Sequence, residues 1–337
     1  MREEQSNRKG GSIGSEYPIG DGMAVHVLGT GSAMPKPNYH PSSHLLQLRD
    51  KYYMIDCGEG TQMQMMCFGL SFQRLHRIFL THLHGDHCLG LPGLLSTMSL
   101  LGMEHPVHIY GPTGTEEYVR FIIDHFCHED DGRLIPHELP ATTRGVIYED
   151  RSLTVSAFPL QHRIPALGYR FDEKPKLRHL RRDMADFYQI PVAYFGRIKQ
   201  GDDWELEDGT IIPNARLTKP ARQPYSYAYC SDTCYSEGII PAVQGVDLLY
   251  HEATFMEEMR ARAEETMHST TRDAATIAEK AGVGHLLIGH YSGRYCNRPM
   301  RELLVQECQS FFPKCIGAYD GLVLSLEALR KAAEEES

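Results

Sequence analysis

The chain has 337 residues, of which 42% are hydrophobic and 23% are charged. This composition is ordinary for a globular protein and excludes a disordered chain, a collagen-like repeat and a small disulfide-rich protein. The formal net charge of −10 argues against a surface covered in positive potential for nucleic acid, although it leaves room for a local basic patch.

The first 22 residues are polar and rich in glycine and serine, which predicts a flexible N-terminal extension (1–22) rather than a secretory signal. No apolar stretch approaches the ~20 residues that a membrane helix needs, so we expect no membrane partner. The nine cysteines contain no Cys-x-x-Cys pair, which favours a reducing compartment and hence a cytoplasmic protein.

The hydrophobic pattern predicts alternating strands and helices over residues 23–337, which we interpret as one domain. Strands are expected at 24–28, 44–48, 52–55, 77–80, 152–158, 225–230, 247–250, 285–288 and 322–326. Helices are expected at 60–68, 116–126, 273–281, 300–311 and 327–336, with a further long polar helix beginning at Met256. Two similar halves of this kind indicate an α/β fold with helices outside the sheets.

In one segment, residues 171–223, the hydrophobic pattern shows no regular alternation of strands and helices. From Arg170 to Lys199 the chain has eight Lys or Arg residues against four Asp or Glu, with several aromatic residues between them, and an acidic stretch follows at 202–208. An insertion with a solvated face is one interpretation of this pattern. A functional arm is the other, because long insertions in compact domains often carry function.

Histidines and an aspartate are concentrated in the loop after the predicted strand 77–80. The loop contains His82, His84, Asp86 and His87 within six residues. Imidazole and carboxylate groups gathered in this way are ligands that Zn²⁺ favours. A solvated histidine-rich turn is the alternative.

Three later residues are further candidate ligands. His162 ends a predicted strand at Pro159–His162, Asp232 follows the predicted strand 225–230, and His290 follows the strand 285–288. Taken singly, each is more often a structural residue than a ligand. Their shared position after apolar strands favours a common site.

The spacing His82-x-His84-x-Asp86-His87 after a buried strand resembles the signature of the metallo-β-lactamase superfamily. Other segments are similar to the ribonuclease Z family in its short form: Val27–Ala33, Ile55–Thr61, His251–Phe255, His268–Thr270, Gly289–Tyr295 and Ala318–Gly321. The chain departs from the family pattern at Tyr194–Arg197, where the family has a Gly-Pro pair, and at Pro35–His40, where the family has an arginine.

This resemblance implies an α/β protein with the metallo-β-lactamase αβ/βα four-layer sandwich and a protruding arm inserted at 171–223. It also implies two Zn²⁺ ions per chain. By the resemblance, His82, His84 and His162 hold one ion, Asp86, His87 and His290 hold the other, and Asp232 bridges the two.

The resemblance further implies a zinc-dependent endoribonuclease that removes the 3′ trailer from precursor tRNA. Hydroxide attack on the phosphodiester would leave a tRNA 3′-OH and a 5′-phosphorylated trailer. Asp86 would position the hydroxide or take its proton, and His268, oriented by Glu252, would protonate the departing 3′ oxygen. Arg294 would bind the phosphoryl oxygens.

The family's arm grips the tRNA, and the basic insertion occupies the corresponding place in this chain. The resemblance therefore assigns tRNA docking to Lys174, Lys176, Arg178, Arg181 and Arg182. It also implies a homodimer.

Two alternatives use the same residues differently. A hydrolase of small phosphodiesters or of a thioester would share the metal site but would have no use for the arm. An RNA-binding protein with an inactive site would need the arm but not the ligands.

Overall fold

The computed structural model describes residues 22–36, 39–127 and 132–335. Except for Gly22, the predicted N-terminal extension (1–22) lies outside the described residues. The chain divides into two compact units, a larger one built from its described residues up to 148, 155–171 and 225 onward, and a smaller one built from 149–154 and 172–224. Within the described ranges, no helix combines the length and the apolar character that spanning a membrane requires.

The first sheet of the larger unit has the strand order β18-β1-β2-β3-β4-β5-β6. Its strands are β1 (Met23–Gly29), β2 (Ser43–Leu48), β3 (Lys51–Ile55), β4 (Leu75–Phe79), β5 (Val107–Pro112), β6 (Leu134–Leu139) and β18 (Val323–Ser325). Strands β1 to β3 are antiparallel, whereas β3 to β6 are parallel. Apolar side chains of α1 (Thr61–Cys67), α3 (Leu91–Leu100) and α4 (Thr115–Phe126) pack against this sheet in one buried cluster.

The second sheet has the order β17-β16-β15-β14-β9-β8-β7. Its strands are β7 (Gly145–Glu149), β8 (Leu153–Pro159), β9 (Leu167–Glu173), β14 (Ser226–Cys230), β15 (Leu248–Glu252), β16 (His285–Gly289) and β17 (Cys315–Gly317). Strands β14 to β17 are parallel, and α8 (Ile240–Val243), α10 (Thr271–Ala281) and α11 (Arg298–Phe311) cover them through a second apolar cluster. The chain closes with α12 (Leu326–Glu335).

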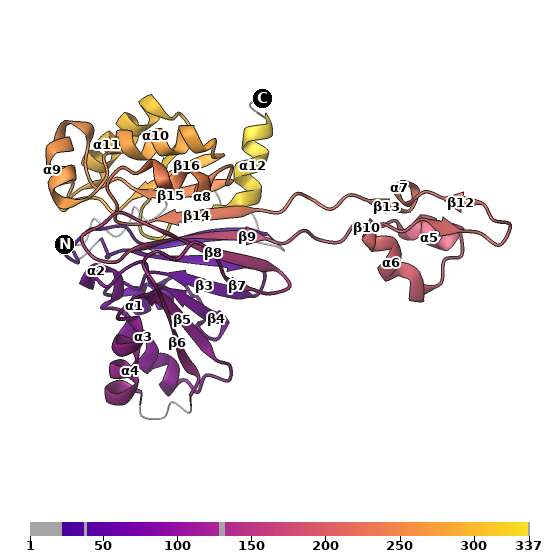
Figure 1. The fold of residues 1–337 in the computed structure, drawn as a ribbon, viewed down its shortest axis with the longest axis horizontal. Coiled ribbons are helices and arrows are strands. Elements are labelled where there is room, and N and C mark those ends of the chain that lie inside the picture. Colours follow the sequence, from indigo (N-terminus) through magenta and orange to yellow (C-terminus); the bar gives the residue numbers. More distant parts are fainter. Residues whose placement is uncertain (1–21, 37–38, 128–131, 336–337) are drawn as a thin grey trace, which may run out of the picture. The chain divides into compact units, whose positions relative to one another are not determined.

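The two sheets face each other, with α3 and α4 outside one and α10 and α11 outside the other (Figure 1). Aromatic side chains fill the space between the sheets: the ring centroids of Phe79 and Tyr169 are 5.3 Å apart. A buried hydrogen bond of 3.0 Å also joins His44 Nδ1 to the hydroxyl of Tyr227. The larger unit is therefore a four-layer arrangement with an aromatic interior.

The smaller unit is inserted between β9 and β14 and has its own apolar core. It contains β10 (His179–Leu180), α5 (Arg182–Phe187), α6 (Phe195–Gln200), β11 (Trp204–Glu205), β12 (Ile211–Ile212), α7 (Asn214–Leu217) and β13 (Thr218–Lys219). Strand β10 pairs with β13, and β11 pairs with β12. The segment 171–223, which showed no regular pattern, thus contains a folded unit built around side chains such as Ile198 and Leu217.

Two local predictions were wrong. The long polar helix expected from Met256 is a single 3-10 turn followed by the short helix α9 (Arg260–Thr266), which ends because Met267 adopts a left-handed φ of 56°. His162 does not end a strand, because β8 stops at Pro159 and His162 lies in the loop that follows.

Candidate metal centre

The candidate ligands follow strands of both sheets and lie in loops or, for Asp86 and His87, in a short helix. His82 and His84 follow β4, and Asp86 and His87 lie in the one-turn helix α2 (Gly85–Cys88) directly after them. Asp232 follows β14, and His290 follows β16. Because β14, β15 and β16 are parallel, their carboxyl ends open at the same edge of the sheet, where α/β proteins place their ligands.

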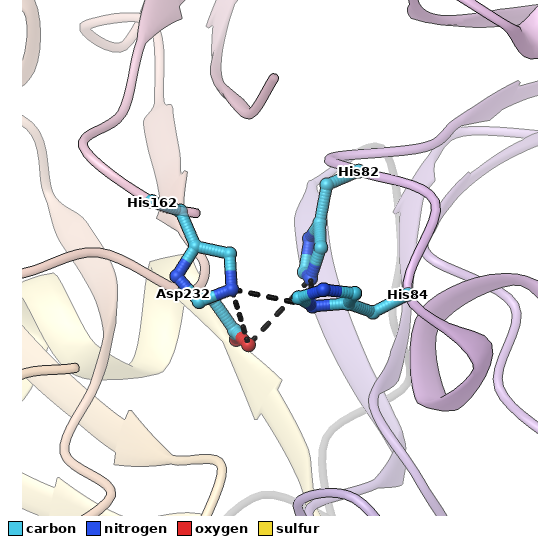
Figure 2. A group of neighbouring side chains, drawn as sticks. All are labelled: His82, His84, His162 and Asp232. Atoms are coloured by element: carbon cyan, nitrogen blue, oxygen red, sulfur yellow. Dashed lines mark hydrogen bonds and ion pairs between the residues drawn. The ribbon is translucent and has the colours of Figure 1, made fainter. Parts of the chain in front are cut away.

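One set of donor atoms comes from His82, His84, His162 and Asp232 (Figure 2). Nδ1 of His84 lies 3.1 Å from Nε2 of His82 and 3.2 Å from Nε2 of His162. The Oδ2 atom of Asp232 lies 3.5 Å from the first of those Nε2 atoms and 3.8 Å from the second. Ligand atoms about 2.0–2.1 Å from a tetrahedral Zn²⁺ are about 3.3 Å apart, so these separations fit one zinc ion.

A second set comes from Asp86, His87 and His290. The Nε2 atoms of His87 and His290 are 3.3 Å apart, and Oδ2 of Asp86 lies 3.6 and 3.4 Å from them. The other oxygen of Asp232, Oδ1, completes the set at 3.4 and 3.2 Å from the same two nitrogens. Because each carboxylate oxygen of Asp232 faces a different set, its geometry is that of a bridging ligand.

Four of the histidines are oriented by a hydrogen bond at the ring nitrogen that faces away from the donor set. The partners of Nδ1 are the hydroxyl of Thr81 for His82 (3.0 Å), the carboxylate of Asp56 for His87 (2.8 Å), the carbonyl of Met267 for His162 (3.0 Å) and the hydroxyl of Thr254 for His290 (2.9 Å). Such bonds fix the tautomer that leaves Nε2 available as a ligand. The sequence pattern did not single out these partners.

Backbone strain is concentrated around the same atoms. Ala33, Asp56, Met267 and His290 are non-glycine residues with φ between 56° and 62°, the left-handed region that side chains rarely adopt. Each has a part in the site. The Ala33 amide donates to Asp86 Oδ2 at 2.7 Å, Asp56 and Met267 accept from His87 and His162, and His290 is itself a candidate ligand. Strain of this kind persists where the surrounding structure holds a functional arrangement in place.

The charges around the centre favour a bound cation. The carboxylates of Asp56, Asp232 and Glu252 are at most 2% exposed, and the side chain of Asp86 is 11% exposed. Across the described ranges, the ion pairs of these four carboxylates are with histidine and none is with Lys or Arg. Several buried carboxylates without a fixed positive partner are costly, and a divalent cation would remove that cost.

His268 lies beside the two sets and is bound to Glu252. Its Nδ1 is 3.0 Å from Oε1 of Glu252 and 3.9 Å from Oδ2 of Asp232. Burial lowers the pKa of His268, but the carboxylates of Glu252 and Asp232 outweigh burial and raise it to about 9. His268, Asp232 and His290 also form a third group of candidate donors. The Nδ1 atom of His268 is already hydrogen-bonded to Glu252.

Two hollows flank the centre. One, of about 350 Å³, is lined by His268, Thr254, Lys36 and neighbouring residues, and the other, of about 370 Å³, by His84, Asp86 and their neighbours. Ala33 lines both hollows. The predicted phosphate ligand Arg294 is exposed, two residues after Ser292, which lines the first hollow.

Thr254 is expected to control metal affinity. Its hydroxyl donates to Oε2 of Glu252 at 2.7 Å and so accepts from Nδ1 of His290 at 2.9 Å. Thr254→Val keeps the shape but leaves the imidazole without its acceptor, so we expect a 10- to 100-fold weaker zinc affinity, measured by competition with a chelator. Thr254→Ser, which keeps the hydroxyl, should bind zinc like the wild type. Equal zinc affinity in the valine variant would show that Thr254 does not orient His290.

Comparison with known proteins identifies relatives over most of the chain. Ribonuclease Z of Porphyromonas gingivalis W83 is 51% identical over 304 residues, which are 90% of this chain and 99% of the relative. Ribonuclease Z of Bacteroides fragilis is 48% identical over 302 residues, 90% and 98% of the two chains. The family described as anti-Pycsar protein Apyc1 matches residues 23–119.

Solved structures support the same fold. The crystal structure of human tRNase Z, short form, aligns with a TM-score of 0.65 at 26% identity, over 90% of this chain and 99% of that one. The metallo-β-lactamase fold protein YhfI of Bacillus subtilis aligns with a TM-score of 0.64 at 20% identity, over 90% and 100% of the two chains. The predicted fold class, the metallo-β-lactamase αβ/βα sandwich, is confirmed.

Proposed function

Because the chain belongs to the ribonuclease Z family, we propose that it is a zinc-dependent endoribonuclease that removes the 3′ trailer from precursor tRNA. The products are a tRNA with a 3′-OH and a trailer with a 5′-phosphate. The observation that carries the proposal is the pair of converging donor sets joined by Asp232, with the His268–Glu252 pair beside them, in a chain of this family.

The proposed cofactor is two Zn²⁺ ions per chain. His82, His84 and His162 would hold one ion, Asp86, His87 and His290 would hold the other, and Asp232 would be shared between them. Zinc bound there supplies Lewis acidity toward phosphate and lowers the pKa of water. The donor separations of 3.1 to 3.8 Å and the outward hydrogen bonds of the histidines support this assignment.

The protein's own groups then handle the protons. Asp86, fixed by the Ala33 amide at 2.7 Å, positions the attacking hydroxide or takes its proton. His268 lines one hollow and binds Glu252 through Nδ1, which leaves Nε2 as the ring nitrogen that can donate a proton. Its raised pKa keeps the ring protonated at neutral pH, as a general acid for the departing 3′ oxygen must be. Arg294 contributes a fork of donors to the phosphoryl oxygens.

The test is cleavage of a precursor tRNA by the purified zinc-loaded protein, with both new ends mapped. A 3′-OH on the tRNA and a 5′-phosphate on the trailer are expected. The alternative, a hydrolase of small phosphodiesters, predicts turnover of bis(p-nitrophenyl) phosphate but no defined cut in the tRNA.

The smaller unit is the proposed docking arm for tRNA. Of the five predicted cations, Arg178 and Arg182 line a hollow of about 410 Å³ together with Lys199, which the sequence analysis did not include. The remaining three, Lys174, Lys176 and Arg181, lie outside that lining. Ion pairing does not distinguish the two groups, because Arg182 pairs with Asp186 at 3.5 Å as Arg181 pairs with Asp183 at 3.1 Å. Because the hollow gathers three cations, we expect it to be the main phosphate contact of the arm.

Replacing Arg178, Arg182 and Lys199 with serine should weaken docking without changing the chemistry. Because contacts far from the scissile bond add binding rather than catalysis, KM for precursor tRNA should rise while kcat changes little. The dependence of log KM on log salt should become shallower by up to about 3, the number of cations lost. Turnover of bis(p-nitrophenyl) phosphate should stay near the wild-type rate.

A matched control removes the same charge elsewhere. Arg120, Lys280 and Lys331 are paired with glutamates on the larger unit, so their triple serine variant changes the net charge equally. It should leave KM and the salt slope close to wild type. Equal effects of the two triple variants would mean that overall charge, and not the arm, attracts the tRNA.

The protein is also proposed to be a homodimer. Met63 and Met66 of α1 are each 57% exposed, the adjacent Phe68 is 43% exposed, and Leu100 and Leu101 at the end of α3 are 79% and 55% exposed. A hydrogen bond from Gln62 to Thr97 joins the two helices, so these apolar side chains lie on connected elements. Exposed apolar patches of this kind mark protein interfaces.

Sedimentation should give the mass of two chains for the wild type. The double variant Met63→Glu, Met66→Glu should sediment as a monomer, because charged groups would have to be buried in the interface. Val146→Glu, at an exposed position of β7 in the other sheet, is the control and should remain a dimer. A monomeric wild type would remove this part of the proposal.

We propose a cytoplasmic location. The nine cysteines all lie within the described residues and form no disulfide, and some, such as Cys57 and Cys230, are buried. A chain with this many thiols and no disulfide fits a reducing compartment.

A further inference from the structure

A further cavity, of about 550 Å³, lies between α11 and the loops at Tyr39 and Tyr319. It belongs to neither hollow beside the metal centre, since His84, Asp86 and His268 are absent from its lining. Tyr291, which lines the cavity, directly follows the candidate ligand His290. The cavity is therefore distinct from the centre but shares a chain segment with it.

The most informative residue in this cavity is Arg301. It is only 8% exposed, and its guanidinium lies over the ring of Tyr39, with 3.5 Å between Cζ and the ring centroid. Nε donates to the carbonyl of Tyr295 at 3.1 Å, and Nη1 donates to the hydroxyl of Thr30 at 3.3 Å. For Nη2 the described residues provide no acceptor.

Arg301 also lacks a carboxylate partner within the described part of the chain. The nearest acid in the lining, Asp320, is used by others: Oδ1 accepts from Thr30 at 2.9 Å, and Oδ2 accepts from the amide and ring of His40 at 2.8 and 2.9 Å. The other acid, Glu302, is paired with Arg298 at 3.0 Å. Burial lowers the pKa of Arg301, as expected for a cation whose desolvation no direct counter-charge offsets.

The surroundings of Arg301 suit a planar ring with polar edges. Tyr319, which lines the cavity, is 45% exposed and offers a surface for stacking. Gln306 and Gln309 add amide groups, and Gln309 uses its Nε2 on the carbonyl of Cys315 at 2.9 Å, which leaves its oxygen available as an acceptor. A buried arginine fork suits phosphate, and aromatic and amide groups recognise unpaired bases. The volume is within the range of small-ligand sites and is larger than a phosphate alone requires.

We propose that this cavity binds a nucleotide, with its phosphate on Arg301 and its base against Tyr319. The nucleotide is either part of an unpaired RNA strand or a free mononucleotide, and the first source rests on the proposed function. Arg301 contacts both the proposed ligand and Thr30, to which it donates a hydrogen bond. Thr30 lies three residues before Ala33, whose amide binds Asp86. Occupancy of the cavity can therefore affect the strained loop at the metal centre.

Calorimetric titration of the zinc-loaded protein with 5′-AMP, 5′-CMP and adenosine tests the proposal. The two nucleotides should bind, and adenosine, which has no phosphate, should bind at least tenfold more weakly. Arg301→Lys loses the planar fork and should weaken nucleotide binding about tenfold or more. Tyr319→Ala, at a half-exposed position where folding is not at risk, should weaken it by roughly tenfold through loss of stacking. Arg120→Ala, which breaks an exposed pair like that of Arg298, is the control and should bind as wild type.

The same titration separates the cavity from the metal centre. In His84→Ala the nucleotide should still bind, because the cavity does not depend on the zinc ligands. Loss of binding in that variant with normal binding in Arg301→Lys and Tyr319→Ala would place the nucleotide at the metal centre and overturn the proposal. Absence of nucleotide binding to the wild type at millimolar concentration would overturn it as well, whatever the outcome of precursor tRNA cleavage.

Competition between 5′-AMP and an unpaired 5′-phosphorylated RNA tetranucleotide shows whether the bound nucleotide comes from an RNA strand or is a free mononucleotide. If it displaces 5′-AMP and loses affinity in Arg301→Lys and Tyr319→Ala to the same extent, the cavity takes a strand of RNA. If it does not compete, the cavity takes a free nucleotide. Both outcomes support a nucleotide site, and the first also extends the RNA-binding surface beyond the arm.

Discussion

Asp232→Asn is expected to remove at least one of the two proposed zinc ions and to abolish cleavage of precursor tRNA. The carboxylate is 2% exposed, and its two oxygens lie 3.2 to 3.8 Å from four ring nitrogens that belong to different donor sets. Asparagine keeps the volume but loses the charge and one of the two anionic oxygens. Because Asp232, as the proposed bridging ligand, would serve both ions, the loss should exceed the 10- to 100-fold effect of outer-shell changes such as Thr254→Val.

Elemental analysis should find about two zinc ions in the wild type and one or fewer in Asp232→Asn. Zinc should raise the melting temperature of the wild type, since a ligand that binds the native state stabilises it by mass action, and it should do so much less in the variant. Asp320→Asn is a matched control, because that aspartate, whose side chain is 11% exposed, has hydrogen-bonded partners but belongs to neither donor set. Two bound zinc ions and unimpaired cleavage in Asp232→Asn would contradict the bridging assignment.

The fold could be predicted from the sequence where apolar runs are uninterrupted. Strands β1, β2, β3, β14 and β16 lie within one or two residues of their predicted bounds, because continuous buried runs give a clear pattern. Strand β6 was not predicted, and its run is interrupted by Pro136, which normally argues against a strand. The helices of the inserted unit were missed because α5 and α6 have only six residues each, too few for a helical period to show.

The candidate ligands could be predicted because each follows a strand or lies in one short motif. Three of their four orienting partners could not, because those contacts join residues 31 to 105 positions apart in the sequence. Asp56 binds His87 across 31 residues of sequence, and the carbonyl that binds His162 belongs to Met267, 105 residues away. A backbone carbonyl has no signature in the sequence. Its position depends on the left-handed turn at Met267, which ends a helix that the polar pattern had predicted to continue.

His268→Ala is expected to slow cleavage of precursor tRNA by 10²- to 10⁴-fold while both zinc ions stay bound, since general acid catalysis typically contributes that much. The ring belongs to neither of the two proposed donor sets, so its loss removes no atom assigned to them. A substrate that releases p-nitrophenolate needs no proton on its leaving group and should lose far less activity. Equal losses on both substrates would remove His268 from the role of general acid.

The pH profile distinguishes a proton donor from a structural histidine. Because the protonated ring is the active form, kcat/KM should fall as pH rises through the pKa of His268, which the neighbouring carboxylates raise to about 9. Zinc at the centre would take up much of the charge of Asp232, which leaves Glu252 as the carboxylate that keeps the ring protonated. Glu252→Gln removes that charge while burial still lowers the pKa, so the fall in activity should move to lower pH. In His268→Ala the fall should disappear from the profile. A basic limb that is unchanged in both variants would assign the titration, and the proton, to another group.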